Sequence, residues 1–462
     1  MALLLVFPAS VSGTWNKFDI ATVTKINSLR NNGPVIRQNY SGFGSAIASI
    51  GDLDQDGVAD LAVGAKGESV DPLDPYGNLH QGALYILFML STGAVKSYVR
   101  ISHLSNGGPS LTKDDEFGAA VCAIGDVNGD NITDLAVGAP GHILGSVYVL
   151  FMRRDGTAMS NQIIRGAFQS VSVIRNQTFA HLLNGPPISY SDRFGQAVAA
   201  IGDFNRDGTP DIAVGAPDAS TGVEKIWLVF LNPTAKVVNY TQIGLMGTKG
   251  GGPSIPAYAG FGVSIQALRD KDGDGVIELA VGARLWRDTS QSKPSSGAVF
   301  VLFLNAMGTV KHYAYFGQLS EEYVPGLGLT MPLNEYDTCG SSLASIGDIN
   351  MDNMRQWFPL ELAQNNPKKR KPRQAVEDLI MGCPMTVQDP GKMYLMFEYP
   401  CEGTECALNG YERAYTQLPG FGNSEKKLGS MLRPRDQYGA SMAGYVDLDG
   451  NGIRDIGTCC SA

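Results

Sequence analysis

One pattern of acidic residues recurs six times in this chain of 462 residues and carries its most distinctive chemistry. The side chains of the first copy are Asp52, Asp54, Asp56 and Asp60. Oxygen donors at alternate positions converge on one point when the chain curls tightly, and Gly57 permits the positive φ that such a curl needs. Carboxylates together with a main-chain carbonyl, here that of Val58, are hard donors that select Ca²⁺. Mg²⁺ is disfavoured because it prefers a smaller shell with several retained waters.

The other copies place their expected ligands at the same positions. The second, third and fourth copies supply Asp126, Asn128, Asp130, Ile132 and Asp134; Asp203, Asn205, Asp207, Thr209 and Asp211; and Asp270, Asp272, Asp274, Val276 and Glu278. The sixth supplies Asp447, Asp449, Asn451, Ile453 and Asp455. The fifth has Asp348, Asn350 and Asp352, but its last acid is displaced to Asp378, so we expect a weak or empty site. We therefore predict about five calcium sites and a doubtful sixth.

These loops have two alternative interpretations. A single loop of this kind could be an Asp/Asn/Gly turn held by its own side chains, but its recurrence at the same place in each unit favours a metal. An EF-hand requires a Glu at position 12 between two helices. Position 12 is instead Val63, Val137, Val214 and Val281 in the first four copies. The flanking segments alternate as strands do, so the loop joins a β-hairpin.

The segments around each loop repeat as well. Repeats start near residues 43, 117, 194, 261, 339 and 438. Each complete unit has an alternating strand, the acidic loop, a short apolar strand such as LAVGA, a variable loop, an aromatic-rich strand such as ALYILFML, and a more polar strand such as VKSYVRIS. Period-2 apolar runs divided by Gly and Asp indicate antiparallel hairpins. Four strands per unit predict an all-β fold, a β-propeller of four-stranded antiparallel blades.

The two ends of the chain predict how the ring closes. The N-terminal MALLLVF resembles the third strands GALYILF and GSVYVLF, whereas the sixth unit stops in its second strand. Residues 1–42 would therefore complete the last blade, giving a single six-bladed domain over residues 1–462. The alternative is a fragment of a seven-bladed propeller. Residues 356–377 look like a loop insertion into the fifth unit, and their KKRKPR run is interpreted as a solvated segment rather than a nuclear-localisation patch.

The combination of F-G, an acidic loop and VGAP resembles the FG-GAP repeat of the integrin α-chain N-terminal β-propeller. VGAP stands at residues 137–140 and 214–217, VGAK at 63–66 and VGAR at 281–284. The resemblance covers nearly the whole chain. It implies Ca²⁺ in hairpin loops on one face and a role in extracellular adhesion or recognition.

We therefore expect an adhesion or recognition module, extracellular or at the cell surface, for a protein or glycan ligand. Its ligand would meet the variable loops at residues 65–81, 140–145, 216–224 and 284–297. The alternatives are the propeller domain of a glycan- or lipid-directed hydrolase or lyase, and a purely structural part of a larger, membrane-anchored assembly. The five histidines show no partner pattern and neither G-x-S-x-G nor H-E-x-x-H occurs, so we expect no enzyme and no catalytic residue.

Composition adds further expectations. The net charge is −9 without a recurring basic face, so we expect no nucleic-acid partner. The sequence contains no run of 18 or more apolar residues, so it predicts no membrane-spanning helix. Among seven cysteines, Cys401 and Cys406 could pair in an oxidising compartment, and the alternative is that all are reduced. Sequons at Asn39, Asn131, Asn176 and Asn239 weakly support a secreted glycoprotein.

Overall fold

The computed structural model describes residues 2–11, 18–27, 30–36, 41–69, 79–141, 144–166, 172–174, 177–179, 185–189, 192–217, 222–244, 250–253, 255–287, 295–317, 328–330, 333, 336–347, 378–384, 392–400, 411–418, 438–444 and 455–460. Within these ranges the regular structure is entirely β. No described segment forms a helix of the length and apolarity that a membrane crossing requires.

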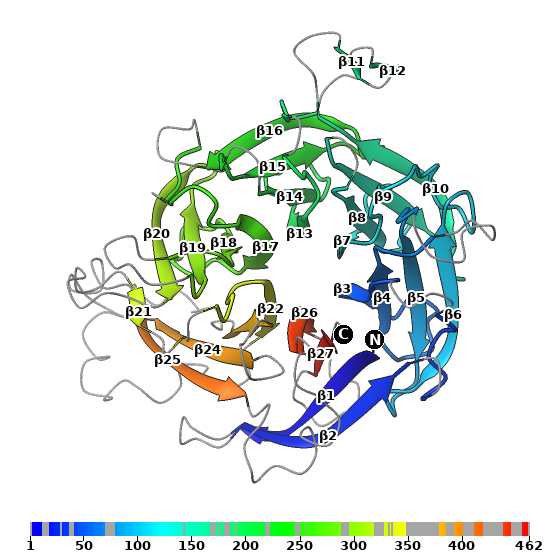
Figure 1. Ribbon diagram of the computed structural model, residues 1–462, viewed down its shortest axis with the longest axis horizontal. Coiled ribbons are helices and arrows are strands. Elements are labelled where there is room, and N and C mark those ends of the chain that lie inside the picture. The colour runs from blue at the N-terminus through cyan, green and yellow to red at the C-terminus, as the bar shows by residue number, and fades with distance from the viewer. Residues whose placement is uncertain are drawn as a thin grey trace, which may run out of the picture.

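Six sheets of antiparallel strands form a ring of blades in the described part of the chain (Figure 1). The first blade holds β3 (Phe43–Gly51), β4 (Asp60–Ala65), β5 (Ala83–Met89) and β6 (Val95–Ser102). The second holds β7 (Ala120–Gly125), β8 (Asp134–Ala139), β9 (Ser146–Met152) and β10 (Ala158–Ile164). The third holds β13 (Ala197–Gly202), β14 (Asp211–Ala216), β15 (Lys225–Leu231) and β16 (Val237–Gly244).

The fourth blade holds β17 (Phe261–Leu268), β18 (Glu278–Ala283), β19 (Ala298–Leu304) and β20 (Val310–Gly317), and β21 (Gly328–Thr330) adds a parallel edge strand. The fifth holds β22 (Ser342–Gly347), β23 (Asp378–Cys383), β24 (Lys392–Pro400) and β25 (Tyr411–Leu418). The sixth holds β26 (Tyr438–Gly444), β27 (Ile456–Cys460), β1 (Ala2–Val11) and β2 (Phe18–Ile26). A separate hairpin, β11 (Ser172–Ile174) with β12 (Gln177–Phe179), lies outside the ring (Figure 1).

The sixth blade is built from both ends of the chain. Strand β1 pairs antiparallel with β27, with Leu3 opposite Cys459, and Figure 1 shows the two termini side by side. The inner strand β26 then contacts β3 of the first blade, which closes the ring. The prediction of a six-bladed propeller closed by N-terminal strands is therefore confirmed among the described residues. That residues 1–462 form one domain, and that 356–377 are an insertion, stays a prediction, because 356–377 lie outside the described ranges.

The hydrophobic core lies between neighbouring blades. The second and third strands of the first four blades are buried along their whole length. Each of these strands is covered by a blade on both faces, which explains why LAVGA and ALYILFM are continuous apolar runs without polar alternation. The fourth strands β6, β10 and β16 expose their central residues at the rim of the ring.

The F-G motif docks each blade onto the preceding one. Phe117, which precedes β7, forms a parallel bridge with Gly82 of the first blade. Its ring lies edge-on to Tyr148, with 5.6 Å between the ring centroids. Ser45 Oγ also donates a hydrogen bond to the carbonyl oxygen of Gly118 at 2.8 Å. The motif is thus an inter-blade contact, and it fixes where each acidic hairpin begins.

The fifth blade replaces part of this motif with a disulfide. Cys339 stands where other repeats have the phenylalanine, Cys383 stands where the second strand of other repeats ends in alanine, and the two are bonded. In the first blade the same positions, Phe43 and Ala65, lie opposite each other. The idea that all cysteines are reduced is therefore wrong. The predicted 401–406 pair lies outside the described residues.

Candidate metal sites

In the first four blades the acidic loops join the first and second strands and are curled by their own carboxylates. In the first loop, Asp52 accepts hydrogen bonds from the main-chain N–H of Asp56 at 3.0 Å and of Gly57 at 2.9 Å. Asp56 Oδ1 accepts from the N–H of Val58 at 2.9 Å. The sixth loop position has a positive φ, 90° at Gly57 and 62° at Asn131. The curl predicted from the alternating acids is therefore present.

The next three loops repeat this hydrogen bonding. Asp126 accepts hydrogen bonds from the main-chain N–H of Asp130 and Asn131. Asp203 accepts them from Asp207 and Gly208, and Asp270 accepts them from Asp274 and Gly275. Since these bonds orient the carboxylates toward the loop interior, they shape a common site in four blades.

The ninth-position acid has a structural role that the sequence did not indicate. Asp60 is fully buried, and its Oδ2 and Oδ1 accept hydrogen bonds at 3.0 Å from the N–H of Leu53 in the loop and of Met89 at the end of β5. Asp134 and Asp211 make the same two bonds in their blades. Burial raises the pKa of all three carboxyls to about 6. Each acid therefore ties the loop to the end of the third strand.

Glu278 occupies this ninth position in the fourth loop and behaves differently. Its Oε2 accepts a hydrogen bond from the N–H of Lys271 at 2.6 Å, whereas Oε1 is buried with no hydrogen-bond partner among the described residues. Burial raises the pKa of this carboxyl to about 8. One oxygen from each of Glu278, Asp270, Asp272 and Asp274 lies within 4.8 Å of the others. A cluster of carboxylate oxygens whose members include a residue with an unsatisfied buried oxygen fits a cation.

Predicted ligands of the first loop also lie close together, whereas most of those in the fifth and sixth loops lie outside the described residues. Asp52, Asp54 and Asp60 also offer oxygens within 4.8 Å of one another. Asp378 and Asp455 are buried at or beside the start of their second strands, as Asp60 is. The remaining predicted ligands of the fifth and sixth loops lie outside the described residues: Asp348, Asn350, Asp352, Asp447, Asp449, Asn451 and Ile453. The carbonyl ligands stay a prediction.

Comparison with protein families agrees with this geometry. The model for the FG-GAP repeat matches residues 43–87, 117–150 and 194–229. The chain carries FG-GAP repeats. Each matched segment runs from the F-G pair through the acidic loop into the third strand of one blade.

Several curated proteins are similar to parts of this chain. Integrin alpha-3 of Cricetulus griseus is 31% identical over 210 residues, 44% of this chain and 17% of the relative. Integrin alpha-5 of Xenopus laevis is 28% identical over 241 residues, 52% and 20% of the two chains. Phosphatidylinositol-glycan-specific phospholipase D of Bos taurus is 25% identical over 291 residues, 62% and 31%. The match spans under a third of each relative. The solved structure of BBS1N in complex with ARL6DN matches with a TM-score of 0.37 and 10% identity, over 91% of this chain and 94% of that one.

Two lysines at the FG-GAP loops were not singled out from the sequence. Lys96 of β6 and Lys311 of β20 each form ion pairs with two carboxylates of the acidic loop in their own blade. The sequence feature that could have identified them is their common position, since each lysine is the second residue of the fourth strand of its blade. The loops therefore differ in the cations next to them.

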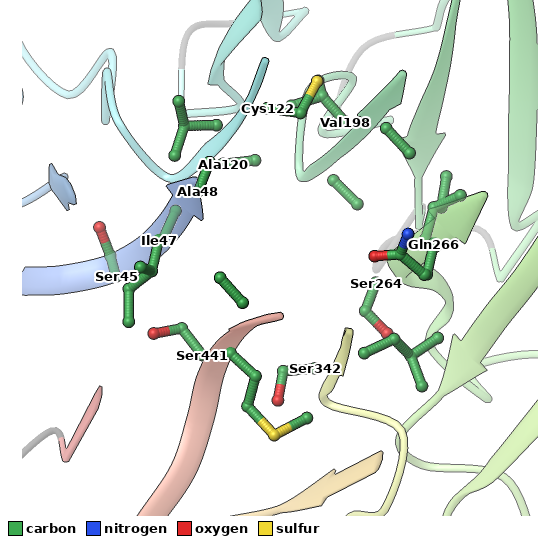
Figure 2. A pocket seen from close by; sticks show the side chains of 18 of the residues that line it. Ser45, Ile47, Ala48, Ala120, Cys122, Val198, Ser264, Gln266, Ser342 and Ser441 are labelled. Atoms are coloured by element: carbon green, nitrogen blue, oxygen red, sulfur yellow. The ribbon is translucent and has the colours of Figure 1, made fainter. Parts of the chain in front are cut away.

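The axis of the FG-GAP ring holds a cavity of about 290 Å³ lined by the inner strands (Figure 2). Figure 2 shows Ser45, Ala120, Ser264, Gln266 and Ser441 around this opening. None of the described residues that line this channel is charged. Its described lining consists of apolar and neutral polar side chains.

The described histidines make contacts of other kinds. His103 Nδ1 accepts a hydrogen bond from the N–H of Leu111 at 2.8 Å. The imidazole of His312 stacks on Phe303 with 4.3 Å between centroids, and His80 Nδ1 lies 3.4 Å from an oxygen of the exposed Asp114. These contacts orient loops and the blade rim.

Proposed function

We propose that this chain is a calcium-stabilised recognition module. Calcium would occupy the acidic loops on one face of the ring, and an extracellular protein or glycan would bind the loops on the other face. The observation that carries the calcium proposal is the Glu278 carboxylate, which clusters with Asp270, Asp272 and Asp274 and whose Oε1 is buried without a partner among the described residues.

The donor set favours Ca²⁺ over other common ions. All the clustered side chains offer oxygen, which suits hard cations, and none offers the sulfur or imidazole that zinc and copper prefer. A bound Ca²⁺ would supply positive charge to carboxylates whose burial is otherwise unfavourable. Asp270, Asp272, Asp274 and Glu278 would hold it in the fourth blade, and Asp52, Asp54 and Asp60 would hold it in the first.

Thermal unfolding tests the calcium proposal. Metal-free protein is expected to melt at a lower temperature than calcium-loaded protein, because an ion that binds only the folded chain stabilises it by about 2.7 kcal/mol at a hundred times its Kd. Differential scanning calorimetry with calcium, magnesium or chelator measures this. Identical melting in calcium and in chelator would refute the proposal.

The recognition face is the one opposite the acidic loops, where second strands connect to third strands. Lys66 and Arg284 follow the VGA sequences that end β4 and β18, and Arg193 precedes the F-G pair of the third repeat. Burial lowers the pKa of Lys66, and the positive charges of Arg193 and Arg284 lower it further. Glu116 pairs with Arg193 at 2.8 Å. This cationic group favours an anionic ligand, such as an acidic protein segment or a sulfated glycan.

The similarity to integrin alpha chains supports an extracellular or cell-surface location and a role in adhesion, within a larger membrane-anchored assembly. Binding of purified protein to immobilised sulfated glycans and extracellular matrix proteins tests this role. The double substitution K66E/R284E is expected to weaken binding more than tenfold, without changing the melting temperature in calcium by more than a few degrees. Unchanged binding of the variant to every probe would contradict the proposed recognition face.

One similar protein is a phospholipase D, which supports a second candidate function: the propeller part of a lipid- or glycan-directed hydrolase. The uncharged lining of the channel favours the binding module instead. Release of a phosphatidylinositol-glycan-anchored reporter from vesicles by the purified chain, above the level of a buffer control, would favour the hydrolase.

A further inference from the structure

A lysine lies over the acidic loop in two blades and not in two others. Lys96, the second residue of β6, places Nζ 2.8 Å from Asp54 Oδ2 and 2.6 Å from Asp56 Oδ2. Lys311, the second residue of β20, makes the same two contacts in the fourth loop, with Nζ 2.6 Å from Asp272 Oδ2. In both blades the ammonium bridges the acids at the third and fifth loop positions. These are two of the acids expected to bind calcium.

The second and third blades have a different arrangement at the same places. The second residues of β10 and β16 are Met159 and Val238, and both are exposed. The third loop position is Asn128 in the second blade and Asn205 in the third. The Nδ2 of Asn128 donates a hydrogen bond to Asp130 Oδ2 at 2.9 Å, and the third loop has the equivalent bond at the same length. An amide nitrogen thus takes the place that the lysine ammonium takes in the other two loops.

These two arrangements balance charge. The first and fourth loops have four acids with a lysine, whereas the second and third have three acids with an asparagine and no lysine. Exchanging an asparagine for an aspartate adds one negative charge, and the lysine on the fourth strand restores the balance. The count of acids at the ligand positions, less the lysine of the fourth strand, is therefore the same in all four loops, although Arg206 and Lys271 add positive charge within the third and fourth loops. All four loops also have a nitrogen donor on the fifth-position acid.

We propose that Lys96 and Lys311 are tethered counter-cations of their loops. Each holds a four-acid loop in its curled shape when no divalent ion is bound, because it offsets the repulsion among clustered carboxylates. Each would also lower the calcium affinity of its own loop, because the ion and the ammonium would compete for the same two carboxylates. The proposal rests on the proposed calcium binding, and it deepens it by making the lysines set the affinity of two sites.

Hydrogen–deuterium exchange with mass spectrometry separates the loops within the full chain. A peptide that covers residues 51–60 reports on the first loop, and one that covers residues 125–134 serves as an internal control. In chelator, K96M, which copies the residue of the second blade, is expected to raise the exchange rate of 51–60 severalfold. In a calcium titration it should lower the protection midpoint of that peptide on the order of tenfold. The control peptide should keep its wild-type rate and midpoint.

The fourth loop and a reverse exchange provide matched variants. K311V, which copies Val238, should have the same two effects on a peptide covering residues 269–278. M159K should raise the calcium midpoint of 125–134 on the order of tenfold, since it adds a competing ammonium to a three-acid loop. The double variant N128D/M159K rebuilds the arrangement of the first loop and should return that midpoint close to the wild-type value.

The two effects of each lysine are judged separately. If K96M exchanges at the wild-type rate in chelator, the lysine does not hold the loop and the proposal is overturned. An unchanged or higher calcium midpoint in K96M would also overturn it. If calcium protects none of the loop peptides in the wild-type chain, the proposed calcium function fails, while the exchange rates in chelator still decide whether the lysines hold the loops.

Discussion

A side-chain carbon on Gly64 would lie 1.9 Å from the carbonyl oxygen of Gly118 in the next blade. The main chains of β4 and of the following F-G motif approach each other so closely that only hydrogen fits between them. The same contact joins Gly138 to Gly195, Gly215 to Gly262 and Gly282 to Gly340. The glycine of VGA is therefore required by the stacking of blades.

Gly64→Ala is expected to destabilise the propeller by about 3 kcal/mol or more, because the added methyl overlaps main-chain atoms that cannot move independently. Urea unfolding in calcium measures the loss. Gly51→Ala is the matched control, since Gly51 has a positive φ but nothing within 4 Å of the added carbon, and it should cost only about 1 kcal/mol. Equal losses in the two variants would contradict the close contact between blades.

Removal of the disulfide by C339A/C383A is expected to cost about 2–4 kcal/mol, because the bond closes a loop across 44 positions of the sequence. The variant C339F/C383A restores the Phe and Ala of other repeats and should regain part of this stability. Its unfolding should also not respond to reductant, whereas that of the wild type should. Peptide mapping without reduction that finds Cys339 as a free thiol would contradict the prediction.

Asp203→Ala is expected to empty only the third loop. Asp203 accepts hydrogen bonds of 2.9 Å from the N–H of both Asp207 and Gly208, so its loss should also destabilise the chain by about 1–3 kcal/mol. Calcium titration followed by exchange of the loop peptides would show protection lost at residues 203–211 and kept at 126–134. Loss of calcium protection in every loop would mean that the blades do not bind independently.

Glu278→Gln is expected to weaken calcium binding in the fourth loop by at least tenfold, because it removes the charge of the oxygen that has no other partner. In chelator above pH 8, where the wild-type Glu278 carboxyl is ionised, the variant should be at least as stable as the wild type, since a neutral amide is less costly to bury than a carboxylate. Melting temperatures with and without calcium test both effects. A variant that keeps the full calcium-dependent rise in melting temperature would show that Glu278 is not a ligand.

Of the two sequon residues that the structure describes, Asn239 is the better placed for a glycan. It is exposed on β16, at the rim of the ring, whereas Asn131 lies within the curled second loop. Expression through a secretory pathway is expected to attach a glycan at Asn239, and N239Q should remove the corresponding mass shift after endoglycosidase treatment. Identical masses of wild type and N239Q before treatment would contradict the prediction.

The strands and the loop positions could be predicted because their signals are local. An alternating run, an Asp-rich turn and an apolar run define a hairpin within about 23 residues, and the repeat supplies independent copies. The closing of the ring could be predicted because the N-terminal segment matches a third strand and the last repeat lacks one.

Contacts between distant positions could not be predicted from one copy of the pattern. Lys96 meets Asp54 across 42 residues, and that contact depends on the twist of the outer strand. The additional hydrogen bonds of Asp60 depend on burial, which the sequence does not specify atom by atom. The disulfide had a usable signal, since aligning the repeats places Cys339 and Cys383 where Phe43 and Ala65 face each other. The odd cysteine count obscured it.

The pairing of β1 with β27 also sets the order of folding events during synthesis. Residues 456–460 are synthesised long after β1, yet β1 needs them as its neighbour. Until then β1 has an unpaired edge, which is prone to association with other chains. A nascent chain of this architecture would therefore benefit from chaperones that cover this edge until residues 456–460 have been synthesised, and the closing of the ring would follow their synthesis and not the folding of any one blade.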